Sequence, residues 1–174
     1  MQSLKPLYTQ GLIGLDELIK EYKSGHKVVK ASAAHIPYLC KHIRIPDLIE
    51  IMCFGDTPEN VFTEAIKASN ENMTALTPDN KPMAMFGAGR AGDGDCYIWL
   101  LGTTDIDKHD MFFMRHSREW VWGFVGIYEK VYNHVHVENH KAIKWLKWCK
   151  AEFEYEVDVY GHQFKKFTIE KDKI

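Results

Sequence analysis

Several features that would identify a protein class are missing from this 174-residue chain. Its four cysteines form no CxxC pair and no disulfide framework, so we expect reduced, buried thiols (Cys40, Cys53, Cys96, Cys149). Basic and acidic residues nearly balance, 22 against 24, which argues against a dedicated nucleic-acid-binding protein. No apolar run approaches the roughly 20 residues of a membrane span, and no secretion signal begins the chain. These absences favour a soluble cytoplasmic protein without a membrane partner.

The composition that is present predicts one folded domain with an N-terminal extension. A hydrophobic content of 45% and an aromatic content of 13% are typical of a globular core. Apolar residues at helical spacing, ended by Ser24-Gly25, predict an amphipathic helix within residues 1–26 (Leu12, Leu15, Leu18, Ile19, Tyr22). This helix either packs on its own domain or docks a partner chain. The domain itself is expected over residues 27–174.

The middle of the chain alternates between helical and extended patterns. Thr57-Pro58-Glu59 predicts a helix start, with a cap, a proline at the first position and an acid at the positive end of the helix dipole. The almost wholly apolar stretch from Cys96 to Leu101 predicts a central strand covered on both faces. The whole order is strand, two helices, three strands, helix, strand, helix and two strands. It predicts an α/β or α+β domain built on one sheet.

The last third, from Val131 to Ile169, has the clearest pattern. Alternating valines predict a strand, after which Asn139 stands where a helix needs a cap for its free amides. Apolar residues then recur at helical spacing, with lysines on the wetter side (Ala142, Trp145, Leu146, Cys149, Phe153; Lys141, Lys144, Lys147, Lys150). FEYEVDVY alternates with period two, and Gly161-His162 turns into a second strand, FKKFTIE.

This order resembles the GNAT acyltransferase superfamily, in which a strand ends near an Asn, a helix follows and a hairpin closes the sheet. The likeness covers roughly residues 27–170. Within it, the stretch from Pro82 to Ile169 resembles internal virion protein A of short-tailed phages, a GNAT-like family linked to virion assembly. The resemblance implies a GNAT-like α+β fold with a mixed sheet of about six to seven strands flanked by helices. It also implies a place in the host cytoplasm or the virion.

An active GNAT protein binds acetyl-CoA, and the resemblance implies which residues here would hold it. Leu100 and Leu101 would pair with the pantetheine arm through their backbone, and Asn139 would orient the cofactor. The family's glycine-rich, pyrophosphate-binding connection between a strand and the next helix would fall at residues 114–119. The pyrophosphate contacts there would be Arg115, Ser117 and Arg118.

Two departures from the family pattern leave two hypotheses open. Residues 114–119 contain no glycine, and Leu146 stands seven residues after Asn139, where many GNAT enzymes carry a proton-donating Tyr. No catalytic residue is therefore assigned. The first hypothesis is a phage protein that acts in virion assembly or binds virion or host proteins, with degenerate acetyltransferase chemistry. The second is an active acetyl-CoA-dependent N-acetyltransferase that modifies a host or phage amine.

Other motifs are weaker. GAGRAG (87–92) matches a dinucleotide-binding pattern but precedes a strand instead of a helix, which favours a hairpin connection. Two clusters resemble metal sites but lack a full ligand set, so no metal site is predicted (His134, His136, His140; Asp105, Asp107, Asp110). Trp122 and Trp148 fall outside the helical stripes and are candidate exposed anchors for a partner.

Overall fold

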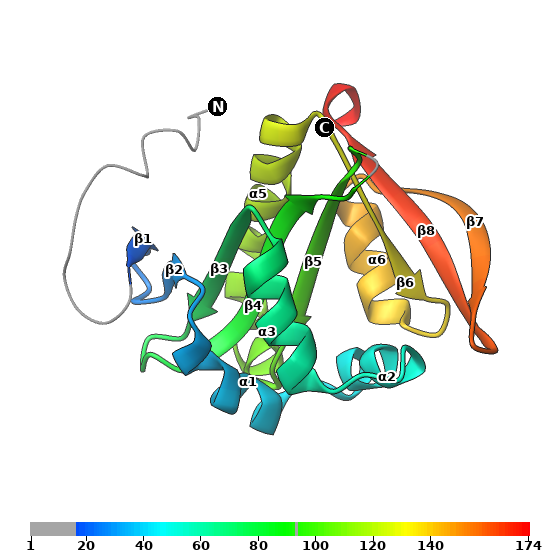
Figure 1. Cartoon of the computed structure of the whole chain (residues 1–174). Helices are drawn as coiled ribbons and strands as arrows, with labels where there is room; N and C mark the ends of the chain where they lie inside the picture. The colour runs from blue at the N-terminus through cyan, green and yellow to red at the C-terminus, as the bar shows by residue number, and fades with distance from the viewer. Residues whose placement is uncertain (1–16, 93) are drawn as a thin grey trace.

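A computed structural model describes residues 17–92 and 94–174, and these residues form one eight-stranded mixed sheet with six α-helices (Figure 1). The strand order is β1-β2-β3-β4-β5-β6-β8-β7. All neighbouring strands are antiparallel except β5 and β6, which are parallel. The strands are β1 (Leu18–Glu21), β2 (Lys27–Lys30), β3 (Glu71–Leu76), β4 (Pro82–Arg90), β5 (Cys96–Gly102), β6 (Lys130–His136), β7 (Glu152–Val159) and β8 (His162–Glu170).

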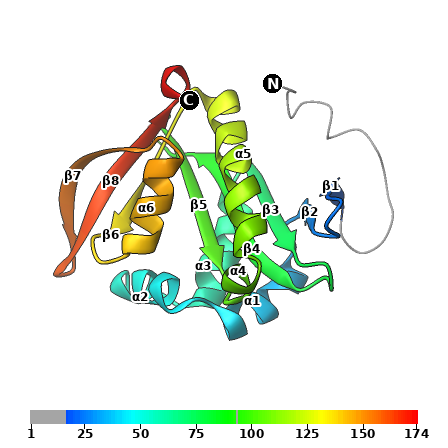
Figure 2. The same cartoon turned by 180° about the vertical axis from the view of Figure 1, so that it is seen from behind.

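The helices cover both faces of this sheet. Helices α1 and α3 lie on one face, α5 and α6 lie on the other, and α2 lies at one end of the sheet below β6 (Figures 1 and 2). The helices are α1 (Ile36–His42), α2 (Ile45–Cys53), α3 (Pro58–Ala68), α4 (Asp105–Lys108), α5 (Asp110–Tyr128) and α6 (His140–Trp148). None of the helices in the described ranges is both long enough and apolar enough to cross a membrane.

Local sequence signals explain where two of the helices begin. The Thr57 side chain accepts a hydrogen bond from the Asn60 amide at the start of α3, and the Asn139 side chain accepts one from the Ala142 amide at the start of α6. Each cap satisfies a backbone amide that has no partner within the helix, as the sequence predicts for both positions.

Strands β4 and β5 form the centre of the core. Eight of the nine β4 residues, from Pro82 to Gly89, are buried. The GAGRAG stretch begins within this strand, and a Cβ at Gly87 would lie only 2.4 Å from the Glu71 carbonyl and 2.9 Å from the Trp99 indole nitrogen. Gly87 and Gly89 therefore allow close packing in the sheet, and strand β5, not a phosphate-binding helix, follows the stretch.

The predicted order has two helices after the first strand, whereas the structure has three, because α1 and α2 are separate helices. Two further sequence predictions of local structure are wrong. Residues 18–21 form strand β1, whose backbone pairs with β2 in the same sheet, instead of an amphipathic helix. The remainder of that predicted helix, with Leu12 and Leu15, lies outside the described residues. Helix α5 begins at Asp110, so residues 114–119 lie within a helix and do not connect a strand to one. The connection after β5 is instead the short segment Thr103-Thr104.

Candidate functional site

The most distinctive feature of the sheet is the divergence of its two parallel strands. β5 and β6 pair at one register position, Tyr97 with Tyr132, and their ribbons separate beyond it (Figure 1). A helix follows each strand, α4 after β5 and α6 after β6. In open sheets, ligands bind outside the carboxyl ends of parallel strands that diverge in this way. We call the region between the diverging ends of β5 and β6 the splay.

Asn133 stands at the vertex of the splay. Its side-chain Nδ2 donates to the Ile98 carbonyl of β5 at 2.6 Å, and its Oδ1 accepts from the neighbouring His134 amide at 2.7 Å. One carboxamide thus satisfies two backbone groups that a continued strand ladder would otherwise pair. Asn133 therefore ends the pairing of β5 with β6 without leaving either group unsatisfied.

Beyond this vertex, β5 presents backbone groups to the splay. Ile98 and Gly102 both bond on the side away from β4, and strand residues alternate in the direction of their backbone groups. The N–H and C=O of Leu100 therefore also face the splay, and we find no partner for them within residues 17–92 and 94–174. Leu101 directs its backbone groups to β4, where it pairs with Met85.

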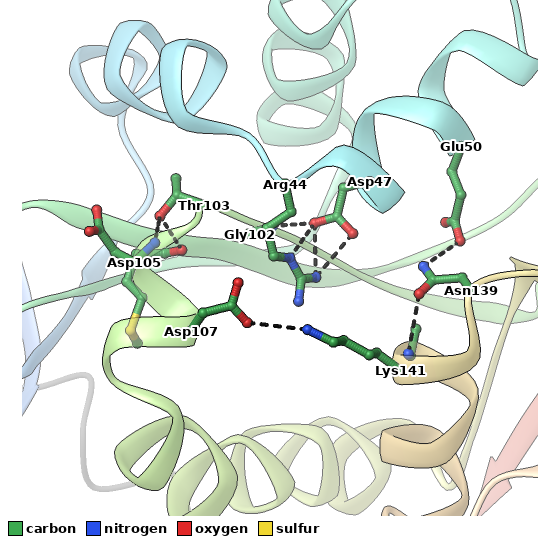
Figure 3. A network of polar contacts seen from close by, with 11 residues as sticks. Arg44, Asp47, Glu50, Gly102, Thr103, Asp105, Asp107, Asn139 and Lys141 are labelled. Carbon is green, nitrogen blue, oxygen red and sulfur yellow. Dashed lines mark hydrogen bonds and ion pairs between the residues drawn. The ribbon is translucent and has the colours of Figure 1, made fainter.

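Helix α2 crosses the open end of the splay and bonds to both sides of it. On the β5 side, the Asp47 carboxylate accepts the Gly102 amide at 2.7 Å. On the β6 side, Glu50 Oε1 accepts the Asn139 side-chain amide at 2.8 Å and the His136 backbone amide at 3.2 Å. Because Asp47 and Glu50 are three residues apart, they share one face of α2, and Figure 3 shows them reaching opposite sides.

Two cations, Arg44 and Lys141, lie at this opening, and a third, Lys108, lies on α4; each pairs with an acid. Arg44 forms a bidentate pair with Asp47, which is only 4% exposed. Lys108 pairs with Asp105 at 2.8 Å within α4. Lys141, at the start of α6, reaches across to Asp107 of α4 at 3.7 Å (Figure 3).

Burial shifts the proton equilibria of the two α2 acids. Desolvation raises the pKa of Glu50 to about 7, and the hydrogen bonds from Asn139 and His136 only partly offset this effect. Desolvation also raises the pKa of Asp47, while the Arg44 guanidinium and the Gly102 amide act in the opposite direction. A carboxyl group with a pKa near 7 can exchange a proton at neutral pH, as general acid–base chemistry requires.

Comparison with solved structures identifies this architecture. An acetyltransferase of the GNAT family from Bacillus anthracis matches with a TM-score of 0.64 at 10% identity, over 89% of this chain and 99% of that chain. The spermidine N-acetyltransferase from Vibrio cholerae, in complex with CoA and spermine, matches with a TM-score of 0.60 at 13% identity, over 87% and 98%. The fold is that of the GNAT acetyltransferases. No protein-family model matches the sequence, and no curated protein matches it either.

The GNAT fold was predicted from the sequence, with about six to seven strands, and the described sheet has eight. The additional strand is β1, at the edge next to β2. The comparisons lend no support to the finer resemblance to internal virion protein A.

The residues expected to bind pyrophosphate lie along α5. Arg115 is exposed on this helix. Ser117 is fully buried, and its Oγ accepts the Trp145 indole N–H at 2.9 Å. The Arg118 guanidinium lies over the rings of Trp122 and Trp148, 4.5 and 4.2 Å from their centroids. Both tryptophans are half-buried by this packing.

Of the other three predicted cofactor residues, Leu100 and Asn139 lie at the splay. Leu101 does not offer the expected backbone contact, because its backbone groups face β4, where it pairs with Met85. Sequence reasoning missed the residues that bond across it, namely Asn133 and the acids of α2. A polar Asn in an otherwise valine-rich strand was the available signal for Asn133. The α2 acids gave none, because Glu50 meets its partners from 86 and 89 positions away in the chain.

Proposed function

We propose that this protein is an N-acyltransferase that uses acetyl-CoA and acts on a cationic amine. The observation that carries the proposal is the splay itself: two parallel strands that separate after one paired position, each followed by a helix. Acetyl-CoA supplies an activated acetyl thioester. The chain's own residues bind that group, orient it and admit the amine.

The groups around the splay fit this cofactor. The Leu100 N–H and C=O are placed to pair with the two amides of a pantetheine arm, as strand backbones pair with extended chains. The N-terminus of α6, which Asn139 caps, favours a nearby negative charge. Lys141 is exposed at the open end of the splay and can reach phosphate oxygens. Arg115, predicted from the sequence for the same task, remains a candidate on the neighbouring helix.

The acyl acceptor is inferred from the charge of Glu50. Within the described part of the chain, Glu50 bonds to two neutral amides and to no cation, although it lies at the open end of the splay. A carboxylate in that position favours an ammonium group on the incoming molecule. The Vibrio cholerae protein of similar fold is a spermidine N-acetyltransferase, so polyamines are the first acceptors to test.

The decisive experiment is titration calorimetry of acetyl-CoA with a matched pair of charge reversals. Lys141→Glu changes a lysine at the open end of the splay, and Lys144→Glu makes the same change in charge one turn further along α6. We expect micromolar binding by the wild type, at least about 10-fold weaker binding by Lys141→Glu and less than about 3-fold for Lys144→Glu. Arg115→Glu, measured alongside, tests the contact predicted from the sequence.

The outcomes separate cleanly. If the wild type binds no acetyl-CoA at millimolar concentration, the proposal is wrong. If both reversals weaken binding equally, the cofactor responds to net charge and does not sit at the splay. Release of the CoA thiol on addition of spermidine or spermine, and no release with an uncharged alcohol, would support a cationic amine as acceptor.

Protein binding in a phage particle or to a host protein is the second candidate. It is favoured by one surface: Ile45, Ile49 and Met52 of α2 recur at helical spacing and are 65%, 46% and 64% exposed. A photo-crosslinker at position 49 is expected to capture one partner in stoichiometric amount from infected cells, and the same probe at Lys144 to capture none. Equal capture at both positions would remove this candidate.

A further inference from the structure

A cluster of metal-binding side chains lies beside the splay, outside the groups used above. Cys53 at the end of α2, His136 at the end of β6 and His162 at the start of β8 each offer one ligand atom. These three atoms lie within 4.8 Å of one another. The sequence pattern had instead grouped His136 with His134 and His140.

The sheet register explains how the two histidines meet. His136 pairs directly with Phe164 across β6 and β8, and His162 precedes Phe164 by two residues. Cross-strand partners and residues two apart share one face of a sheet, so both imidazoles project to the same side. Their ring centroids are 6.1 Å apart.

Helix α2 brings the thiol to the same face. Phe54, the residue after Cys53, packs on Phe164 with ring centroids 5.2 Å apart. Cys53 itself is 6% exposed, whereas His162 is exposed at the hairpin. The cluster thus has a buried sulfur on one side and a solvent-accessible imidazole on the other, so an ion can reach it from solvent.

We propose that Cys53, His136 and His162 bind a zinc ion, with water in the fourth position. One thiolate and two imidazoles suit this borderline-soft cation, and three protein ligands leave a tetrahedral site with one open position. Bond lengths of about 2.0–2.3 Å place tetrahedral ligand atoms about 3.5 Å apart, so the three side chains close in by about 1 Å. On binding, the Cys53 thiol releases its proton to solvent and each imidazole donates a ring lone pair.

One existing contact competes with the ion. The Glu138 amide donates to His136 Nδ1 at 3.2 Å. Metal binding through either ring nitrogen gives up this bond, because Nδ1 then carries the metal or a proton. The Glu138 amide lies at an exposed residue, where water replaces the lost acceptor.

The ion would anchor α2. Cys53 ends the helix whose acids, Asp47 and Glu50, bond to the two sides of the splay. A metal held jointly by α2, β6 and β8 therefore fixes the position of this helix over the opening. This inference does not depend on the proposed acyltransferase activity, since it concerns the metal and the helix alone.

The test uses full-length, tag-free, reduced protein titrated with Zn²⁺ against a chromophoric chelator. We expect one equivalent to bind, with affinity reduced about 100-fold or more in Cys53→Ser and in His162→Gln. His140→Gln, a neighbouring exposed histidine outside the cluster, is the matched control and should bind as the wild type does. Co²⁺ should give a thiolate charge-transfer band that Cys53→Ser abolishes. His162 is exposed, so its variant will fold.

Two results would overturn the proposal. Stoichiometric binding that His162→Gln and Cys53→Ser leave unchanged would place the metal elsewhere. Binding too weak to compete with the chelator for Zn²⁺, together with no cobalt–thiolate band, would exclude the site. Hydrogen exchange then tests the anchor: Zn²⁺ should slow exchange of the α2 amides in the wild type and leave α3 unchanged. Equal protection of both helices would refute the anchoring role.

Discussion

Substitution of Asn133 by alanine tests the account of the splay most directly. The carboxamide makes two short bonds, to the Ile98 carbonyl at 2.6 Å and from the His134 amide at 2.7 Å. A lost hydrogen bond with a buried partner costs about 1–3 kcal/mol, and the half-buried setting of Asn133 lets water recover part of it. We therefore expect Asn133→Ala to lower the free energy of unfolding by about 2 kcal/mol in total. For a chain of this size, that corresponds to a fall of about 4–8 °C in Tm.

Urea unfolding followed by circular dichroism measures this loss. Asn60→Ala is the control, because Asn60 is exposed and its side chain bonds to the nearby, exposed Asp56. This substitution should cost less than about 0.5 kcal/mol. A loss below 0.5 kcal/mol in Asn133→Ala would mean that the strands part for another reason. A gain in stability would be more damaging, since it would show that β5 and β6 pair further when the amide is removed.

Two further perturbations probe the rest of the fold. Burial, with His109 and His116 nearby, lowers the pKa of His26. Below pH 6.5 the folded protein therefore binds fewer protons than the unfolded chain does. The free energy of unfolding should be highest above pH 6.5 and fall as the pH drops below it. His26→Phe should flatten this slope in urea unfolding between pH 7 and pH 5, and an unchanged slope would assign it to other groups. Phe62→Ala, at a fully buried site, should lower the free energy of unfolding by about 3–5 kcal/mol in the same assay. Phe54→Ala, at a half-exposed site, should lower it by less than about 1 kcal/mol. Equal losses would contradict the burial assigned to Phe62.

Much of the fold followed from local signals in the sequence. Thr57 and Asn139 cap α3 and α6 as expected, because a cap depends on a few adjacent residues. The final hairpin also formed as predicted, but its turn is Tyr160-Gly161, both at positive φ, one residue before the predicted Gly161-His162. The residues that determine these elements lie within about ten positions of one another, so the sequence pattern predicts them.

The errors arose where distant contacts decide. Residues 18–22 fit a helical stripe, but backbone pairing with β2 makes Leu18–Glu21 a strand. The polar run before α5 conceals two helix starts, Asp105 and Asp110, each with an acid in its first turn but without a side-chain cap. The site suffers most from this limit, because its bonds join α2 to β5 and α6 across the fold.

The acids at the open end of the splay do not prevent phosphate binding, because the Lys141–Asp107 and Arg44–Asp47 ion pairs differ in strength. Lys141 and Asp107 are 84% and 62% exposed, and an exposed ion pair contributes only about 0–1 kcal/mol. A charge-assisted bond to phosphate contributes about 1.5–3 kcal/mol, so Lys141 can exchange Asp107 for a cofactor oxygen. Arg44 is different: its partner Asp47 is buried and also holds the Gly102 amide, and breaking such a pair costs about 3–5 kcal/mol. Lys141 is therefore available to a ligand, whereas Arg44 holds α2 in place.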